Sequence, residues 1–166
     1  IIGFYIGWWA CVLGTANDLP YFGPTVMILF LIVHYYLFMS DIQEIYLVLI
    51  IGTIGTITDS LLFLSGSFIY AGAYSNEILI APMWITAMWA GFAATVNHSM
   101  SWLKDKWLLM VICGVVFGPV AFFTGEKFGA IEFNLSALFS VLVIAIVYGI
   151  LMPAIYFLNR HLGLDE

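Results

Sequence analysis

Three ionisable side chains lie inside long apolar segments of this sequence, where an unpaired charge costs most. Asp59 follows a run of glycines and threonines, and His34 and His98 each belong to another apolar stretch. Carboxylates and imidazoles accept and release protons, and an ionisable group in an apolar segment is a functional hypothesis in itself. We therefore predict Asp59, His98 and His34 as candidate catalytic residues.

The spacing around Asp59 indicates where its side chain points. Gly52, Thr56 and Asp59 recur at helical intervals and share one helix face. Small residues on this face let another helix come close, so we expect Asp59 to point into the protein. There it could carry a proton, anchor a ligand or act in catalysis, or it could make a buried hydrogen bond between helices. At about 1.5 Å per residue, His34 falls near mid-segment and His98 near an end, which makes Asp59 with His34 the easier pair.

Further polar residues lie at the ends of the apolar segments. Asn97 precedes His98, whose imidazole could be a general base, could contact a lipid headgroup, or could simply be satisfied by water. On the opposite side, Glu126 with Asn17, Asp18 and, as a further candidate, Asp59 could frame a polar pocket, or Glu126 could pair with Lys127 in a solvated loop. The predicted ligand-binding residues are Asp59, Asn97, His98, Glu126 and Asn17.

The histidine and cysteine pattern predicts neither a metal site nor a cofactor. His34 and His98 are expected at different depths, and no Cys–His pair has ligand spacing. The sequence also lacks a Gly-Xaa-Ser-Xaa-Gly elbow, a phosphate-binding loop and a His-Glu-Xaa-Xaa-His motif. Enzyme chemistry is therefore an alternative and not the main prediction.

The composition shows in which environment these residues act. Of 166 residues, 64% are hydrophobic and only 8% are charged, and the formal net charge is −6. A soluble domain carries about 25% charged residues, which excludes a soluble enzyme. The acidic balance also excludes a basic surface for nucleic acid. We expect an integral membrane protein with membrane lipid, and no nucleic acid, as its partner.

Six apolar runs are available to position the candidate residues. A bilayer core about 30 Å thick needs roughly 20 apolar residues of helix, and these runs do not alternate as strands of a membrane barrel would. The predicted fold class is therefore all-α: a single domain, residues 1–166, built as a bundle of six transmembrane helices. The predicted spans are residues 1–16, 22–39, 44–64, 78–102, 107–124 and 135–159.

Basic residues indicate the orientation of such a bundle. With six spans, Lys104, Lys106 and Arg160 share one side and Lys127 lies on the other. The positive-inside rule then places the first side in the cytoplasm.

Small residues recur at helical spacing on the first run. Such a stripe is a packing face, either within the bundle or against a protein partner or a second copy of the chain. The stripe consists of Gly3, Gly7, Ala10 and Gly14.

Five segments carry a likeness to a known family: Gly7–Gly14, Asp59–Leu61, Asn97–Leu103, Gly118-Pro119 and Gly125–Ala130. They resemble an uncharacterised family of small bacterial inner-membrane proteins, a domain of unknown function found mostly in proteobacteria. The likeness spans nearly the whole chain. It implies a multi-pass protein of the bacterial inner membrane and brings no assigned activity.

A looser similarity concerns architecture alone. Six spans in about this length, with Pro24 opening the second span and Gly52, Gly55 and Asp59 in the third, resemble the rod-shape membrane protein of the cell-wall elongation machinery. They also resemble the substrate-binding subunits of vitamin transporters. This similarity implies a fold and no function.

Three functions remain open at this point. The main prediction is a membrane module that binds a lipid or small apolar ligand, or that scaffolds a membrane partner, because small-residue faces are many and paired catalytic groups are few. The alternative is an intramembrane lipid-modifying enzyme that uses Asp59 with His34 or His98. The second alternative is a small proton-coupled transporter, although no inverted repeat supports it.

Overall fold

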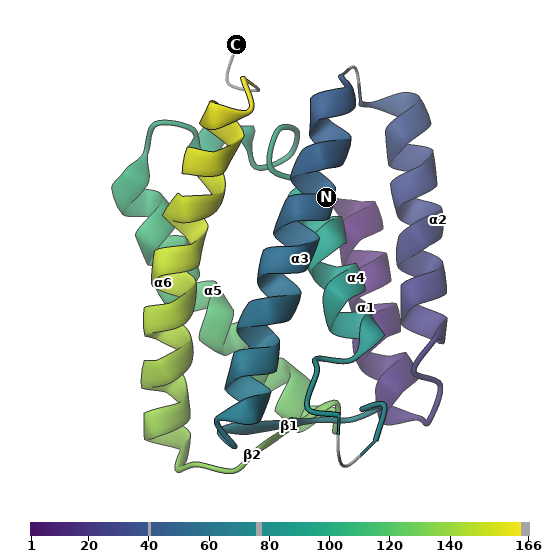
Figure 1. The fold of residues 1–166 in the computed structure, drawn as a ribbon, viewed down its shortest axis with the longest axis vertical. Coiled ribbons are helices and arrows are strands. Elements are labelled where there is room, and N and C mark those ends of the chain that lie inside the picture. Colours follow the sequence, from purple (N-terminus) through teal and green to yellow (C-terminus); the bar gives the residue numbers. More distant parts are fainter. Residues whose placement is uncertain (40, 76–77, 164–166) are drawn as a thin grey trace.

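The computed structural model describes residues 1–39, 41–75 and 78–163 (Figure 1). Within these residues the chain is mostly helical, with one short 3-10 turn and two short strands. In chain order the elements are α1 (Ile2–Ala16), α2 (Phe22–Leu37), α3 (Ile42–Leu64), β1 (Phe68–Tyr70), α4 (Met83–Ala93), η1 (Ser101–Leu103), α5 (Trp107–Lys127), β2 (Ile131–Phe133) and α6 (Ala137–His161).

The six described helices fall into two length classes. Helices α3, α5 and α6 are long and apolar enough to cross a membrane; at about 1.5 Å per residue they measure roughly 31 to 38 Å. Helices α1, α2 and α4 have 15, 16 and 11 residues and reach only about 17 to 24 Å, short of a bilayer core of about 30 Å. The prediction of six helices is confirmed, but spanning length is found in three of them.

The largest departure from the predicted spans lies in residues 78–102, where α4 covers only the middle. The Thr95 hydroxyl donates to the Phe92 carbonyl over 2.7 Å, and the Asn97 amide donates to Asn159 of α6 over 2.9 Å. Side chains that bond nearby backbone or another helix compete with helix continuation. The apolar run therefore changes from helix to a folded-back turn after Ala93, although its hydropathy stays high.

The helices pack mainly as antiparallel pairs: α1 with α2, α3 with α4, and α5 with α6. Figure 1 shows α3 between the α5–α6 pair and the α1–α2 pair. One end of the bundle holds the two strands and the start of α6. The other end holds the α2–α3 link, the turn after α4 and the end of α6. Because α5 begins where α6 ends, Lys104, Lys106 and Arg160 share this second end, as predicted, and Lys127 lies at the first.

Two short strands correct the prediction of an all-α fold. Strands β1 and β2 pair antiparallel, with Phe68 opposite Phe133 and Tyr70 opposite Ile131. The side chains of Phe68 and Tyr70 are buried while Ile69 between them is exposed, which is the alternation of a strand with one face on a core. The paired loops close the first end of the bundle beneath α3 and α5.

The small-residue stripe of α1 packs against α2. A Cβ atom placed on Gly3 would come within 2.6 Å of the Phe30 ring, and one on Gly7 within 2.7 Å of the Met27 side chain. These positions therefore allow the two helices to approach closely. A further role of Gly3, Gly7, Ala10 and Gly14 toward a protein partner stays a prediction.

Candidate functional site

Asp59 is buried on α3, as predicted, with a relative exposure of 1%. Its Oδ1 accepts a hydrogen bond from the Tyr70 hydroxyl over 2.9 Å, and its Oδ2 accepts one from Trp89 Nε1 over 2.6 Å. The Trp89 ring in turn stacks on Tyr148 of α6, with ring centroids 5.4 Å apart. The carboxylate thereby joins α3, β1 and α4 in what we call the Asp59 cluster (Asp59, Tyr70, Trp89).

A glycine one helical turn before Asp59 makes room for this arrangement. A Cβ atom on Gly55 would overlap the Trp89 ring, whereas one on Gly52 would meet only Ala90 at an ordinary 3.7 Å. The Ser60 hydroxyl oxygen, beside Asp59, accepts a hydrogen bond from the backbone amide of Ala81 over 2.9 Å. The predicted close-approach face of α3 is thus confirmed, and the element that approaches it is α4 with its preceding loop.

The donors of the Asp59 cluster keep their protons. Burial, with the nearby Asp59 carboxylate, raises the pKa of Tyr70 well above its ordinary value, so its hydroxyl remains a donor across the physiological range. Within the described part of the chain, the hydrogen-bond partners of Asp59 are a tyrosine and a tryptophan instead of the predicted histidine. This geometry ties three elements together, with one hydrogen bond to each carboxylate oxygen.

A second polar cluster lies at the other end of α3. His98 Nε2 is 2.7 Å from Glu44 Oε2, and the rings of His34 and His98 meet edge to face with centroids 4.6 Å apart. One nitrogen from each histidine and one carboxylate oxygen all lie within 4.8 Å of one another. We call His34, Glu44 and His98 the His–Glu–His cluster; it joins the end of α2, the start of α3 and the turn after α4.

The closeness of His34 and His98 corrects the depth argument from the sequence. Helix α2 ends at Leu37, so His34 belongs to its last turn and not to the middle of a span. His98 lies in the turn after α4, at the same end of the bundle. The helix ends predicted from hydropathy placed His34 and His98 at different depths, whereas the observed helix ends bring the two rings into contact.

His34 is the most confined member of this cluster, with 6% exposure. The backbone of Ala94 lies next to its ring, and its Nε2 has no hydrogen-bond partner among residues 1–39, 41–75 and 78–163. Phe30 and Phe38 flank the ring, with centroids 5.5 and 5.3 Å away. The imidazole is therefore held in place while one of its nitrogens is left available.

The other predicted ligand residues are divided between the two ends. Asn97 donates to Asn159, and its buried Oδ1 has no partner in the described part of the chain. Asn17 is the C-cap of α1 and donates to the Leu13 carbonyl over 2.8 Å. Asn17 thus serves its own helix, and Asn97 ties the turn after α4 to α6.

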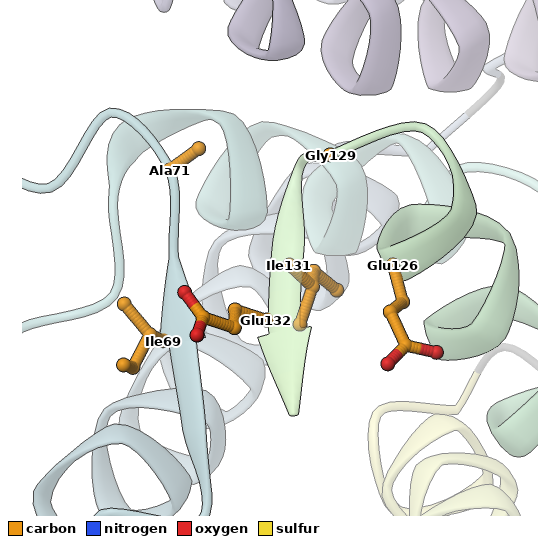
Figure 2. A pocket seen from close by; sticks show the side chains of 6 residues that line it. All are labelled: Ile69, Ala71, Glu126, Gly129, Ile131 and Glu132. Carbon is orange, nitrogen blue, oxygen red and sulfur yellow. The ribbon is translucent and has the colours of Figure 1, made fainter. Parts of the chain in front are cut away.

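Glu126 lines a hollow at the strand end of the molecule (Figure 2). The hollow has a volume of about 370 Å³, and neither Asn17 nor Asp59 is among the described residues that line it. Figure 2 shows Glu126 and Glu132 on different sides of β2 in this view. The lining consists of Ile69, Ala71, Glu126, Gly129, Ile131 and Glu132.

A groove of about 470 Å³ lies between α5 and α6 at the end that holds the His–Glu–His cluster. Its lining combines basic, aromatic and aliphatic side chains, and its Arg160 pairs with Asp105 of the preceding link. We call it the α5–α6 groove. The residues that characterise it are Lys104, Arg160, Trp107, Phe157, Met110 and Pro153.

Sequence reasoning missed Glu44, Tyr70 and Trp89 as site residues. A usable signal existed for Glu44, which begins a run of buried α3 positions spaced by three or four: Glu44, Leu47, Ile51, Gly55, Asp59 and Leu62. That spacing places Glu44 on the same inward face as Asp59. Tyr70, at the end of an apolar run, has the position of an interfacial anchor, and Trp89 lies 30 residues from Asp59 in the sequence.

The chain matches a family model described as "Protein of unknown function (DUF2878)" over residues 1–154. No curated protein and no solved structure matches it. Helices α3, α5 and α6 indicate a multi-pass membrane protein. The resemblance to an uncharacterised family is thus confirmed at the level of the family: this chain belongs to the DUF2878 family of proteins of unknown function.

Proposed function

We propose that this protein is a non-enzymatic membrane module that binds an anionic lipid in the α5–α6 groove. The observation that carries the proposal is the mixed lining of that groove, in which two basic side chains and the acidic Asp105 lie beside aromatic and aliphatic ones. A phospholipid has the matching division, with a charged headgroup joined to an apolar body. The groove also lies at the end of the bundle that carries Lys104, Lys106 and Arg160.

Each part of the lining has a partner in such a lipid. Lys104 and Arg160 supply charged donors for a phosphate group. Trp107 is an exposed aromatic residue at the first position of α5, the location where tryptophan anchors at a membrane interface. Phe157 and Pro153 of α6 offer apolar surface for the glycerol and acyl region.

The ion pair between Arg160 and Asp105 leaves room for this role. Both side chains are largely exposed, and exposed ion pairs contribute only about 0 to 1 kcal/mol. A lipid phosphate can therefore compete with Asp105 for the guanidinium group. Replacing Asp105 by asparagine is expected to strengthen lipid binding, because the Asp105 carboxylate then no longer competes for Arg160.

Native mass spectrometry of the protein released from nanodiscs tests this proposal. Nanodiscs that contain phosphatidylglycerol and phosphatidylcholine in equal amounts are expected to leave phosphatidylglycerol bound. The Lys104→Gln/Arg160→Gln variant is expected to lose this preference, whereas Lys127→Gln, at the opposite end, keeps it. Displacement by inorganic phosphate would assign the site to free phosphate instead. Equal retention of both lipids by the wild type overturns the proposal.

One observation favours an intramembrane lipid-modifying enzyme as a second candidate. His98 is held by Glu44 over 2.7 Å, and a carboxylate-bound imidazole is a common general base. In this candidate His98 takes the catalytic role and Asp59 stays structural. Incubation of the protein with phospholipid vesicles is expected to yield a changed lipid that His98→Gln does not produce; an unchanged lipid extract removes this candidate.

A further inference from the structure

We infer that His34, Glu44 and His98 form a binding site for one divalent first-row transition-metal ion. This inference is independent of the α5–α6 groove and rests on the convergence of three metal-binding side chains from three separate elements. The two histidines come from the last turn of α2 and the turn after α4, and the glutamate comes from the first turn of α3.

The spacing of the donor atoms suits such an ion. Metal–ligand bonds of about 2.0 to 2.1 Å in a tetrahedron place ligand atoms roughly 3.3 Å apart. In the His–Glu–His cluster His98 Nε2 lies 2.7 Å from Glu44 Oε2, and one donor atom from each of the three residues lies within 4.8 Å of the others. Side-chain rotations that move each donor atom by about 1 Å are therefore enough to bring the three atoms to bonding distance from one ion.

His34 distinguishes this cluster from a plain ion pair. A His98–Glu44 pair by itself has no need of a second imidazole, yet His34 packs edge to face on His98. Its Nε2 is buried and has no hydrogen-bond partner within the described residues, which is a costly state for a polar atom. Coordination of a metal ion would satisfy that nitrogen.

The surroundings of His34 are those of a metal-bound imidazole. The backbone of Ala94 lies next to the His34 ring, and Nε2 is a ring nitrogen with no hydrogen-bond partner among the described residues. In metal-ligating histidines the N–H of the second ring nitrogen usually donates a hydrogen bond to a carbonyl or carboxylate. This bond fixes the tautomer and directs the lone pair of the first nitrogen at the metal. Phe30 and Phe38 hold the ring between them, so the orientation is set before an ion arrives.

The donor set selects the class of ion. Two imidazole nitrogens and one carboxylate oxygen are the ligands of open zinc sites and of non-haem iron(II) sites. Calcium and magnesium prefer oxygen ligands throughout. Three protein ligands leave at least one position on the metal for water or for an added ligand, so the site is open and not a closed structural one.

Cobalt(II) titration of the purified full chain tests the inference. The protein is purified in mild detergent without a histidine tag, stripped with a chelator, and titrated while the visible absorption of bound cobalt is recorded. We expect one ion per chain, displaced by zinc but not by magnesium. His34→Gln, His98→Gln and Glu44→Gln are each expected to weaken binding by at least about tenfold, the loss seen even for outer-shell changes.

His161→Gln is the matched control, because His161 is an exposed histidine at the end of α6. It is expected to bind cobalt like the wild type. Thermal unfolding and tryptophan fluorescence show that each variant is folded before its affinity is compared. The inference is overturned if the folded wild type binds neither cobalt nor zinc, or if His34→Gln binds as tightly as the wild type. In the second case His98 and Glu44 form only an ion pair.

Discussion

Helix α3 carries two buried carboxylates that differ in their partners. Asp59, near one end, is 1% exposed, and Glu44, in the first turn, is 7% exposed. Asp59 accepts hydrogen bonds from Tyr70 and Trp89, one at each oxygen. Glu44 instead contacts His98, beside which a second imidazole keeps a buried nitrogen without a partner in the described structure.

The difference teaches that burial of a carboxylate does not by itself identify a functional site. A tryptophan N–H only donates, and the Tyr70 hydroxyl stays protonated because its pKa is raised. These two donors each pair with one oxygen of Asp59 and tie it to the neighbouring elements. Imidazole can donate, accept, titrate or bind a metal, so Glu44, unlike Asp59, shares its cluster with side chains capable of further chemistry. The chemistry of the partner separates a structural carboxylate from a functional one.

The largest expected effect is on stability and comes from removing the acceptor in the Asp59 cluster. Asp59→Ala leaves the donors of Tyr70 and Trp89 buried without an acceptor, at roughly 1 to 3 kcal/mol each. We expect the free energy of unfolding to fall by about 3 kcal/mol, measured by denaturation in mixed micelles with tryptophan fluorescence. Glu126→Ala, at an exposed carboxylate, is the control and is expected to change stability by less than about 0.5 kcal/mol. An equal loss of unfolding free energy in both variants would contradict a structural role for Asp59.

The next effect concerns the space that Gly55 leaves for Trp89. A methyl group at Gly55 overlaps the indole ring, and overpacking of this kind costs about 1 to 3 kcal/mol. Gly52→Ala, one turn earlier on the same helix, meets only an ordinary contact with Ala90 and is expected to be neutral or stabilising by up to about 1 kcal/mol. The same micelle denaturation compares the pair, and equal effects would show that Trp89 is not held tightly.

Alkaline pH gives a smaller and more specific effect on the same cluster. Unfolded Tyr70 loses its proton near pH 10, whereas folded Tyr70 keeps it because its pKa is raised. Above about pH 10 the unfolded state therefore binds fewer protons than the folded state. The contribution of Tyr70 to the free energy of unfolding then falls by about 1.4 kcal/mol per pH unit. Tyr70→Phe is expected to lose that part of the slope in a series of unfolding curves from pH 9 to 11.5. Tyr74→Phe, at an exposed tyrosine, should keep the wild-type slope.

The smallest expected effect is that of Glu44→Gln on stability without metal. The side chains of His98 and Glu44 are 26% and 9% exposed, and the hydrogen bond between them contributes about 0.5 to 1.5 kcal/mol net. Glutamine also retains a hydrogen-bonding group. We expect metal-free Glu44→Gln to unfold within about 1 kcal/mol of the wild type, in contrast to Asp59→Ala. A loss as large as that of Asp59→Ala would make both ends of α3 structural.

Much of the helical framework could be predicted from the sequence. The predicted spans 44–64 and 135–159 correspond to Ile42–Leu64 and Ala137–His161, because a long uniform apolar run leaves few alternatives to a membrane helix. The predicted helix over residues 78–102 is too long, because average hydropathy does not show where side chains compete for backbone hydrogen-bonding groups. Polar side chains such as Thr95 and Asn97 end the helix at Ala93 while the average stays apolar.

The candidate site could be predicted only in part. The inward direction of Asp59 follows from helical spacing and is confirmed by its burial. Its partners could not be predicted, since Tyr70 lies in a strand that forms only by pairing with β2. His34 and His98 were recognised as residues with possible chemistry, but their contact depends on where α2 ends and on the turn after α4.

The sequence by itself determined that this is an apolar, helical membrane protein, because those properties depend on averages over many residues. The tertiary structure alone decided which polar groups meet. A shift of one helical turn moves a side chain by about 5.4 Å, more than the 2.7 Å that joins Glu44 to His98. Helix ends and turns therefore determine whether a buried charge is satisfied, as at Asp59, or shares its cluster with a nitrogen open to a ligand, as beside Glu44.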